Sequence, residues 1–134
     1  MSDEITFGTP EFFSRIAQSL AADDVWRAKA ANLSASMVYV YGEPMNRAMS
    51  VKFEKGVLTE YAAVDPAAPP AADFVISGRG DLWKSIATGK VKPTVAMAGG
   101  KLKVKGKQTL LLRNMGAFTR LMDIQTSLPV HFDC

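Results

Sequence analysis

The chain has 134 residues, of which 48% are hydrophobic and 22% charged, and this balance is typical of one soluble globular domain. No apolar run approaches the ~20 residues of a membrane-spanning helix, and the acidic N-terminal segment MSDEITFGTP does not have the layout of an export signal. The single cysteine is the last residue, Cys134, which excludes an internal disulfide. We therefore expect one cytoplasmic domain that spans residues 1–134.

The positive charge is concentrated in one segment. Residues 84–107 contain seven lysines and no acidic residue, whereas residues 1–83 contain 11 acidic and 7 basic residues. The formal net charge is only +3. This uneven distribution predicts a protein with one positive face.

The N-terminal quarter of the chain is predicted to be helical. Thr9-Pro10-Glu11 is a typical helix start, with a capping hydroxyl, a proline at the first helical position and an acid near the positive end of the dipole. Phe12, Ile16 and Leu20 follow at helical spacing and give this helix an apolar face. Asp23-Asp24 then predicts the cap of a second, shorter helix.

Strand periodicity begins at Ser34. Residues 34–43 and 47–54 alternate apolar and polar side chains, and residues 57–64 continue as a third strand after a short turn at Lys55-Gly56. Three strands joined by tight connections predict an antiparallel meander. Its apolar face needs a covering layer.

The second half of the chain alternates helices and strands. After a Pro/Ala-rich loop at 65–72, the pattern predicts a strand at 73–78, helices at 79–90 and 93–98, a strand at 101–106, and a helical segment at 107–128. Gly116 divides this last segment, and Pro129 ends it. The fold class is therefore α+β, with one mixed sheet and helices over one face.

No motif in the sequence predicts catalysis, a metal site or a cofactor. Gly100-Lys101 lacks both the first glycine and the hydroxyl of a phosphate-binding loop, and Trp83 stands where the dinucleotide fingerprint requires its third glycine. His131, the only histidine, lies beside no plausible nucleophile, and a pairing of His131 with Cys134 would sit at a frayed terminus.

Three explanations remain open for the lysine-rich stretch. Lysine on an edge strand discourages pairing with another chain. Lys101, Lys103 and Lys105 also suit contact with an anionic membrane surface. Nucleic acid is the least favoured partner, because the outward positions of this strand carry no aromatic or arginine side chains for stacking or base recognition.

The same region resembles the type-two sterol carrier protein domain family. The matching positions are Gly89-Lys90, Pro93, Ala96, Gly100-Lys101-Leu102-Lys103-Val104 and Gly106, followed by a leucine-rich helix from Gln108. Lys107 replaces an asparagine that is common in the family. The C-terminal HFDC differs from the peroxisomal address of eukaryotic relatives, which indicates a free-standing, bacterial-like member.

The resemblance implies a five-stranded sheet and covering helices that enclose an apolar tunnel for a fatty acid, a fatty acyl-CoA, a sterol or a similar lipid. It implies binding and transfer without catalysis. Two other roles stay open: an accessory protein that presents a lipid-like intermediate, such as a quinone precursor, to enzymes, and a regulatory or dimerisation domain of an enzyme. The residues alone favour a solid core, because apolar side chains at helical spacing usually fill one, and only the family resemblance favours a tunnel instead.

The candidate lipid-binding residues are the apolar side chains that the expected helices and the family signature direct inward. They are Phe12, Ile16, Trp83, Ile86, Val95, Met97, Leu102, Leu110, Met115, Phe118 and Met122.

Overall fold

The computed structural model describes residues 5–128 and 130–132, with only the backbone of Gln108. In chain order the elements are β1 (Ile5–Thr6), α1 (Pro10–Ala21), α2 (Asp24–Lys29), β2 (Ala35–Gly42), β3 (Arg47–Glu54), β4 (Val57–Val64), β5 (Phe74–Arg79), α3 (Gly80–Ala87), α4 (Pro93–Ala98), β6 (Lys103–Gly106), α5 (Gln108–Arg113), α6 (Met115–Gln125) and β7 (Val130–His131). None of the helices in the described ranges combines the length and the hydrophobicity that a bilayer crossing requires.

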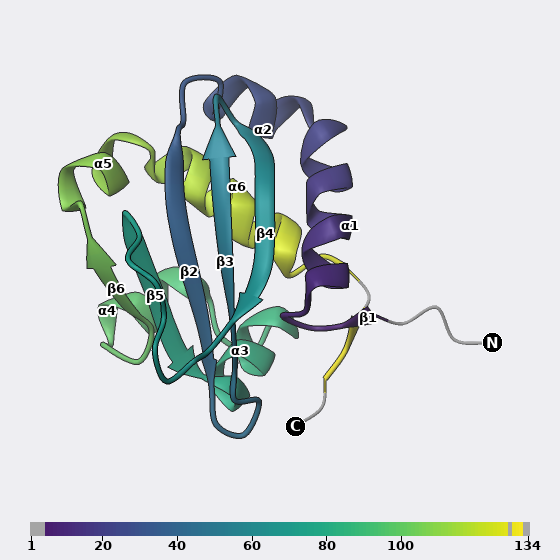
Figure 1. The fold of residues 1–134 in the computed structure, drawn as a ribbon, viewed down its shortest axis with the longest axis vertical. Coiled ribbons are helices and arrows are strands. Elements are labelled where there is room, and N and C mark those ends of the chain that lie inside the picture. Colours follow the sequence, from purple (N-terminus) through teal and green to yellow (C-terminus); the bar gives the residue numbers. More distant parts are fainter. Residues whose placement is uncertain (1–4, 129, 133–134) are drawn as a thin grey trace.

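The main sheet has five strands in the order β4-β3-β2-β5-β6 (Figure 1). Strands β2 and β5 run parallel, and the other neighbouring pairs run antiparallel. The expected α+β class and five-stranded mixed sheet are confirmed. The pattern gave no sign of the short parallel pair between β1 and β7, because two-residue strands show no periodicity.

The helix starts agree with the sequence. The Thr9 hydroxyl accepts a hydrogen bond from the Phe12 N–H, and Pro10 occupies the first turn of α1. The Asp23 carboxylate caps α2 by accepting from the Trp26 N–H at 2.7 Å. Arg120 on α6 donates to the same carboxylate, and this hydrogen bond together with the Trp26 N–H holds the pKa of Asp23 below its ordinary value. One side chain thus starts α2 and ties it to α6.

The turn between β3 and β4 depends on backbone conformations that most residues avoid. Lys55 and Gly56 both have positive φ, at 48° and 80°, which matches the twist that a two-residue hairpin turn needs. A Cβ on Gly56 would lie 2.5 Å from the Ala30 carbonyl oxygen. The Gly56 carbonyl accepts from the Trp26 indole N–H at 2.8 Å, so this turn also positions α2.

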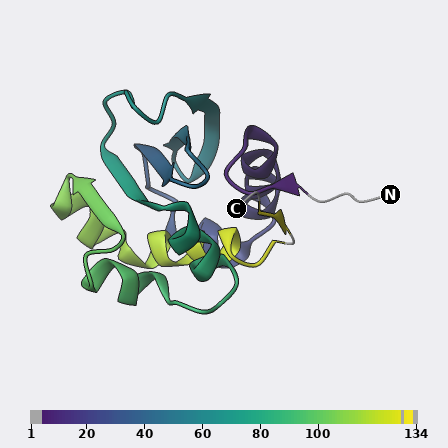
Figure 2. The ribbon, with the colours of Figure 1, turned by 90° about the horizontal axis from the view of Figure 1, so that it is seen from below.

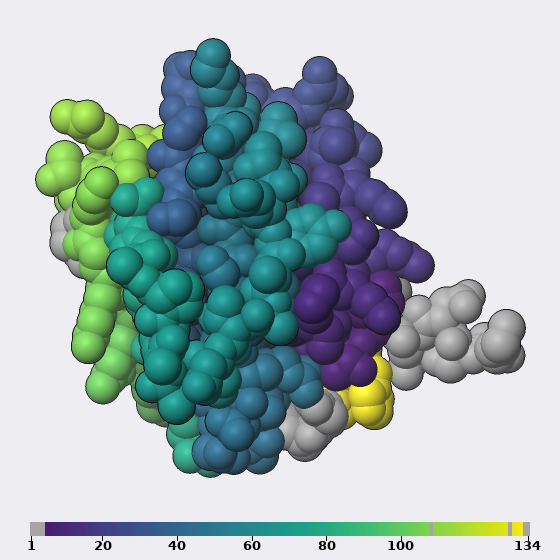
Figure 3. Space-filling model, viewed as in Figure 1, coloured from purple at the N-terminus to yellow at the C-terminus, as the bar shows by residue number. Residues whose placement is uncertain are grey.

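Helices cover one face of the sheet and leave the other largely bare. Met49, Val51 and Phe53 on β3 are buried under the helices, whereas the alternating residues Lys52 and Glu54 are exposed. Seen from below, α6 and its neighbouring helices lie on one side of the strands, and α1 lies beside them (Figure 2). The space-filling view shows the opposite side, formed mainly by strands and flanked by α1 and by β6 with α5 (Figure 3). The helical side therefore holds the interior in which a ligand is expected.

The expected C-terminal helical segment is divided, as predicted. The break lies at Asn114, two residues before Gly116, and separates α5 from α6. Helix α6 ends at Gln125. The expected stop at Pro129 lies outside the described residues.

Candidate functional site

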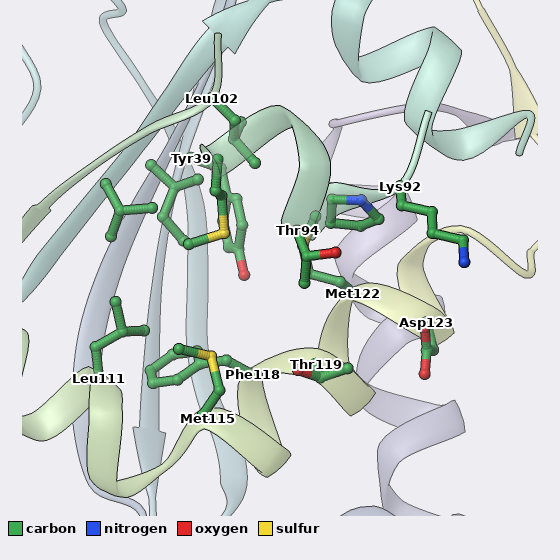
Figure 4. Close-up of a pocket in the computed structure, with 14 residues that line it drawn as sticks. Tyr39, Lys92, Thr94, Leu102, Leu111, Met115, Phe118, Thr119, Met122 and Asp123 are labelled. Carbon is green, nitrogen blue, oxygen red and sulfur yellow. The ribbon is translucent and has the colours of Figure 1, made fainter. Parts of the chain in front are cut away.

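A cavity of about 310 Å³ lies on the helical side of the sheet (Figure 4). Helix α4 and strand β6 form one wall, and helices α5 and α6 form the opposite wall. Its wall is mainly apolar. The lining residues are Tyr39, Ile76, Lys92, Pro93, Thr94, Met97, Leu102, Val104, Leu111, Met115, Phe118, Thr119, Met122 and Asp123.

The helical wall follows from spacing in the sequence. Leu111, Met115, Phe118 and Met122 recur at intervals of four, three and four residues, which places them on one side of α5 and α6. The Phe118 ring meets the Phe74 ring on β5 edge-on, with centroids 5.2 Å apart. This contact anchors α6 against the sheet beside the cavity.

The opposite wall depends on β6 being held at the edge of the sheet. Val104 and the preceding Leu102 face the cavity, while Lys103 and Lys105 alternate with them and are exposed. Gly106 ends the strand with φ at 136°, and a Cβ there would lie 1.9 Å from the Asp73 carbonyl oxygen. The final glycine of the family signature is therefore required by a close approach of two backbones.

Asp73 joins β6 to the central strands. Its carboxylate accepts from the Ser36 N–H at 3.0 Å and pairs with the Lys107 ammonium at 3.0 Å. The backbone hydrogen bond from Ser36, followed by the contact with Lys107, lowers the pKa of Asp73, so the carboxylate remains ionised at neutral pH. Lys107, which departs from the family pattern, thus has a structural partner.

One side of the cavity is polar. Lys92, Thr94, Thr119 and Asp123 line it, and all four are exposed. Figure 4 shows Lys92 and Asp123 on the same side of the cavity, away from Leu102, Leu111 and Met115. The site is therefore amphipathic, with an apolar interior and a solvated polar side.

Tyr39 supplies a polar group deep in the cavity wall. Its hydroxyl points into the space between Leu102, Phe118 and Met122 (Figure 4). The Gln125 side-chain amide donates to this hydroxyl at 3.1 Å. Burial raises the pKa of Tyr39 well above its ordinary value, so the phenol stays neutral at physiological pH.

The structure brings together five of the residues that the sequence nominated. Met97, Leu102, Met115, Phe118 and Met122 all line the cavity. They come from three separate segments of the chain. Their identity as ligand contacts remains a prediction.

Four other nominated residues lie in a filled part of the interior. Phe12, Ile16, Trp83 and Ile86 are at most 2% exposed and do not line the cavity. Trp83 packs on Tyr39 with ring centroids 6.0 Å apart, so Tyr39 separates this core from the cavity. Phe7, Phe12 and Tyr41 complete the aromatic packing, which explains why the hollow does not reach α1.

The last two nominated residues flank the cavity without lining it. Val95 on α4 is 60% exposed, whereas its neighbours Pro93, Thr94 and Met97 line the cavity. Leu110 packs partly buried against the core, while Leu111 beside it faces the cavity. A shift of one residue along a helix turns the side chain by about 100°, which is enough to exchange these roles.

Sequence reasoning missed the sheet residues and the polar side of the cavity. Tyr39 and Ile76 lie on the inward faces of their strands, but alternation does not tell which inward residues meet a hollow. Leu111 stood in the same helical row as Met115, Phe118 and Met122, and that row was the available signal. Lys92 and Asp123 are remote in sequence, and only the fold brings them to one side.

Metal-binding groups form no cluster in the described part of the chain. There, no three His, Cys, Asp or Glu side chains are grouped so as to hold a metal ion. His131 is exposed on β7, and its proposed neighbour Cys134 lies outside the described residues.

Comparison with known proteins connects this geometry to one family. The profile of the SCP-2 sterol transfer family matches residues 16–119. A comparison with curated proteins finds no match.

Solved structures agree with this match at the level of the fold. The crystal structure of sterol carrier protein 2 has a TM-score of 0.78 and 20% identity, covering 90% of this chain and 97% of that one. A conserved hypothetical protein from Thermus thermophilus, whose description suggests a sterol carrier protein, also has a TM-score of 0.78 and 20% identity, covering 97% of this chain and 94% of that one.

An enzyme also contains a similar fold. The sec-alkylsulfatase Pisa1 from Pseudomonas sp. has a TM-score of 0.55 and 24% identity over 79% of this chain, but only 15% of the sulfatase is covered. This likeness concerns one part of the enzyme. With a family profile that spans most of its length and a matching five-stranded fold, the chain belongs to the SCP-2 sterol transfer family.

Proposed function

We propose that this protein binds a single-chain lipid, such as a fatty acid or its acyl derivative, in the cavity and transfers it without chemical change. The observation that carries the proposal is the amphipathic cavity: apolar side chains from β2, β5, β6, α5 and α6 surround it, and polar groups line one side. An acyl chain matches the apolar wall, and its head group matches the side that contains Lys92, Thr94 and Thr119. Family membership supports a hydrophobic ligand in general.

The size of the cavity favours one chain over a bulky ligand. Its volume of about 310 Å³ is near the lower end of the ~300–1,000 Å³ range of ligand pockets. Each buried CH₂ contributes ~0.8 kcal/mol, so burial of about ten contributes ~8 kcal/mol before ordering costs. With no ordering cost this would correspond to a dissociation constant of about 1 µM, so the net affinity is micromolar or weaker. Such binding is tight enough for loading and weak enough for release to a membrane.

A displacement assay tests the proposal directly. A fluorescent fatty acid should bind with a micromolar dissociation constant, and lauric to palmitic acids should displace it. Mass spectrometry of a solvent extract from the purified protein should identify the ligand acquired in the cell. If the probe does not bind and the extract contains no lipid, the cavity is not a lipid site.

Contact with a membrane is proposed for the lysine-rich edge. Strand β6 is an edge strand, and Lys101, Lys103 and Lys105 are exposed on or next to it. Edge protection alone would account for lysine here. In the membrane role, these charges also attract the β6 wall of the cavity to anionic lipid. Each lysine near the surface contributes about 1 kcal/mol to the binding free energy.

Reversing Lys101, Lys103 and Lys105 to glutamate should slow lipid exchange with anionic vesicles at least tenfold and leave exchange with neutral vesicles unchanged. The matched control reverses Arg27, Lys52 and Lys55, which are also exposed but lie away from β6. Stopped-flow transfer of the fluorescent fatty acid measures both rates. Equal slowing with both vesicle types, or by both triple variants, would leave edge protection as the explanation.

A similar fold within the sulfatase favours one alternative, a domain that assembles with an enzyme. A dimerisation domain is the related alternative. A regulatory or dimerisation domain should form dimers or co-purify with its enzyme. An accessory protein that presents a lipid-like intermediate should also co-purify with an enzyme. Light scattering on the isolated chain separates these cases from an independent carrier. A monomer without co-purifying protein supports the carrier.

A further inference from the structure

A buried amide lies behind the inner wall of the cavity. Gln125 near the end of α6 is 1% exposed, and apart from tyrosines it is the only polar residue buried to this degree in the described part of the chain. Its Nε2 donates to the Tyr39 hydroxyl at 3.1 Å, but its Oε1 is buried without a hydrogen-bond partner among the described residues. Folded proteins rarely leave a buried acceptor unpaired, because the group has lost its water.

Two cavity residues contact this amide. Tyr39 and Met122 both line the cavity, and the Met122 Sδ lies 3.9 Å from Gln125 Nε2. The Tyr39 hydroxyl donates to the Met37 Sδ at 3.6 Å, so its hydrogen is engaged only by a weak acceptor. Methionine is flexible and changes rotamer readily. A rotation of Met122 would therefore open the amide to a ligand in the cavity, which the phenol already lines.

We propose that Gln125, with Tyr39, forms a hydrogen-bonding subsite for a hydroxyl group at the buried end of a lipid chain. This inference rests on the proposed function, since it assigns a polar end to the ligand of that cavity. A ligand O–H donates to the Gln125 Oε1, and its oxygen accepts from the Tyr39 O–H, which turns away from Met37. Both weakly satisfied groups then have a partner.

The chemistry of the subsite discriminates between ligand ends. Gln125 Oε1 only accepts, so it requires a donor and repels a carboxylate oxygen. Among the described residues, Lys92 is the only cationic side chain that lines the cavity, and it belongs to the polar side. A carboxylate buried at Tyr39 would therefore be desolvated without a counter-charge from these residues. A methyl end binds but leaves Oε1 unpaired. The ligand class that satisfies both ends is an ω-hydroxylated fatty acid, with its carboxylate beside Lys92 and its hydroxyl at Gln125.

A comparison of matched ligands gives the test. Lauric, myristic and palmitic acids are each compared with their ω-hydroxy derivatives for displacement of a fluorescent fatty acid. An all-apolar cavity would bind each hydroxylated acid at least tenfold more weakly than its parent, because the hydroxyl loses its water. In the wild-type protein, we expect the ω-hydroxy acid of the best-fitting length to bind about threefold to tenfold more tightly than its parent.

Gln125→Leu removes the acceptor with little change in shape. It should reverse this preference, so that the ω-hydroxy acid binds at least tenfold more weakly than its parent, while the parent acid binds as in the wild type. Gln125→Met serves as a second replacement if the leucine variant does not fold. Tyr39→Phe should remove part of the preference, since it deletes the second hydrogen-bonding group.

The outcomes separate the two proposals. If the parent acids do not bind to the wild type, the proposed function fails. If they bind but the hydroxyl weakens binding equally in the wild type and in the Gln125 variants, the lipid site stands and the hydroxyl subsite is overturned.

Discussion

Replacing Gly106 by alanine should lower the free energy of unfolding by at least ~3 kcal/mol. The backbone at Gly106 has φ of 136°, which L residues rarely adopt, and the added Cβ would lie 1.9 Å from the Asp73 carbonyl oxygen. This neighbour is backbone beside the β5–β6 pairing, where Gly106 faces Phe74, so it cannot move without breaking the ladder. Thermal unfolding should show a drop in Tm on the order of 10 °C.

Gly100→Ala is the matched control. Gly100 also has a positive φ, 76°, but a Cβ there meets nothing within 4 Å. Its replacement by alanine should lower the free energy of unfolding by about 1 kcal/mol, because only the backbone conformation is unfavourable for alanine. Similar losses at both positions would show that the close approach to Asp73 is not a constraint. The Gly106 variant should also bind lipid poorly, because β6 carries the Val104 wall of the cavity.

The sequence predicted the fold well because its elements have strong local signals. Thr9-Pro10 starts α1, Lys55-Gly56 makes the β3–β4 turn, and alternation of Leu102 and Val104 with lysines marks the region of β6. Each of these depends on neighbours within a few residues. Strands β1 and β7 have no such signal, since their pairing depends on contact between the two ends of the chain.

The cavity was less predictable because hollow space is a property of three-dimensional packing. Burial is encoded in the pattern, and Phe12 and Trp83 are buried as their spacing indicates. Whether a buried side chain meets another side chain or a void depends on which rings converge. Near Tyr39, Phe13 and Trp83 fill one side, while α4 and α6 stand apart on the other. The family signature located this second side through Met97 and Leu102.

Replacing Met115 by tryptophan should weaken fatty acid binding at least tenfold and leave the fold intact. Met115 lines the cavity but is also 38% exposed, so it lies where the hollow meets the surface. An indole there can turn its apolar ring into the cavity without displacing the core. Filling the space of two or three methylenes removes ~2 kcal/mol of burial, which corresponds to more than a tenfold change in the dissociation constant.

Leu112→Trp provides the control for this experiment. Leu112 lies on the adjacent helix α5, is 69% exposed and does not line the cavity, so the same substitution adds the same ring outside the site. Displacement of the fluorescent fatty acid measures binding, and far-ultraviolet circular dichroism with thermal unfolding verifies the fold. Normal binding by Met115→Trp would mean that lipid does not occupy the space beside α6. Loss of binding by Met115→Trp alone would place the acyl chain in contact with Met115, because the two variants gain the same ring and have the same tryptophan content.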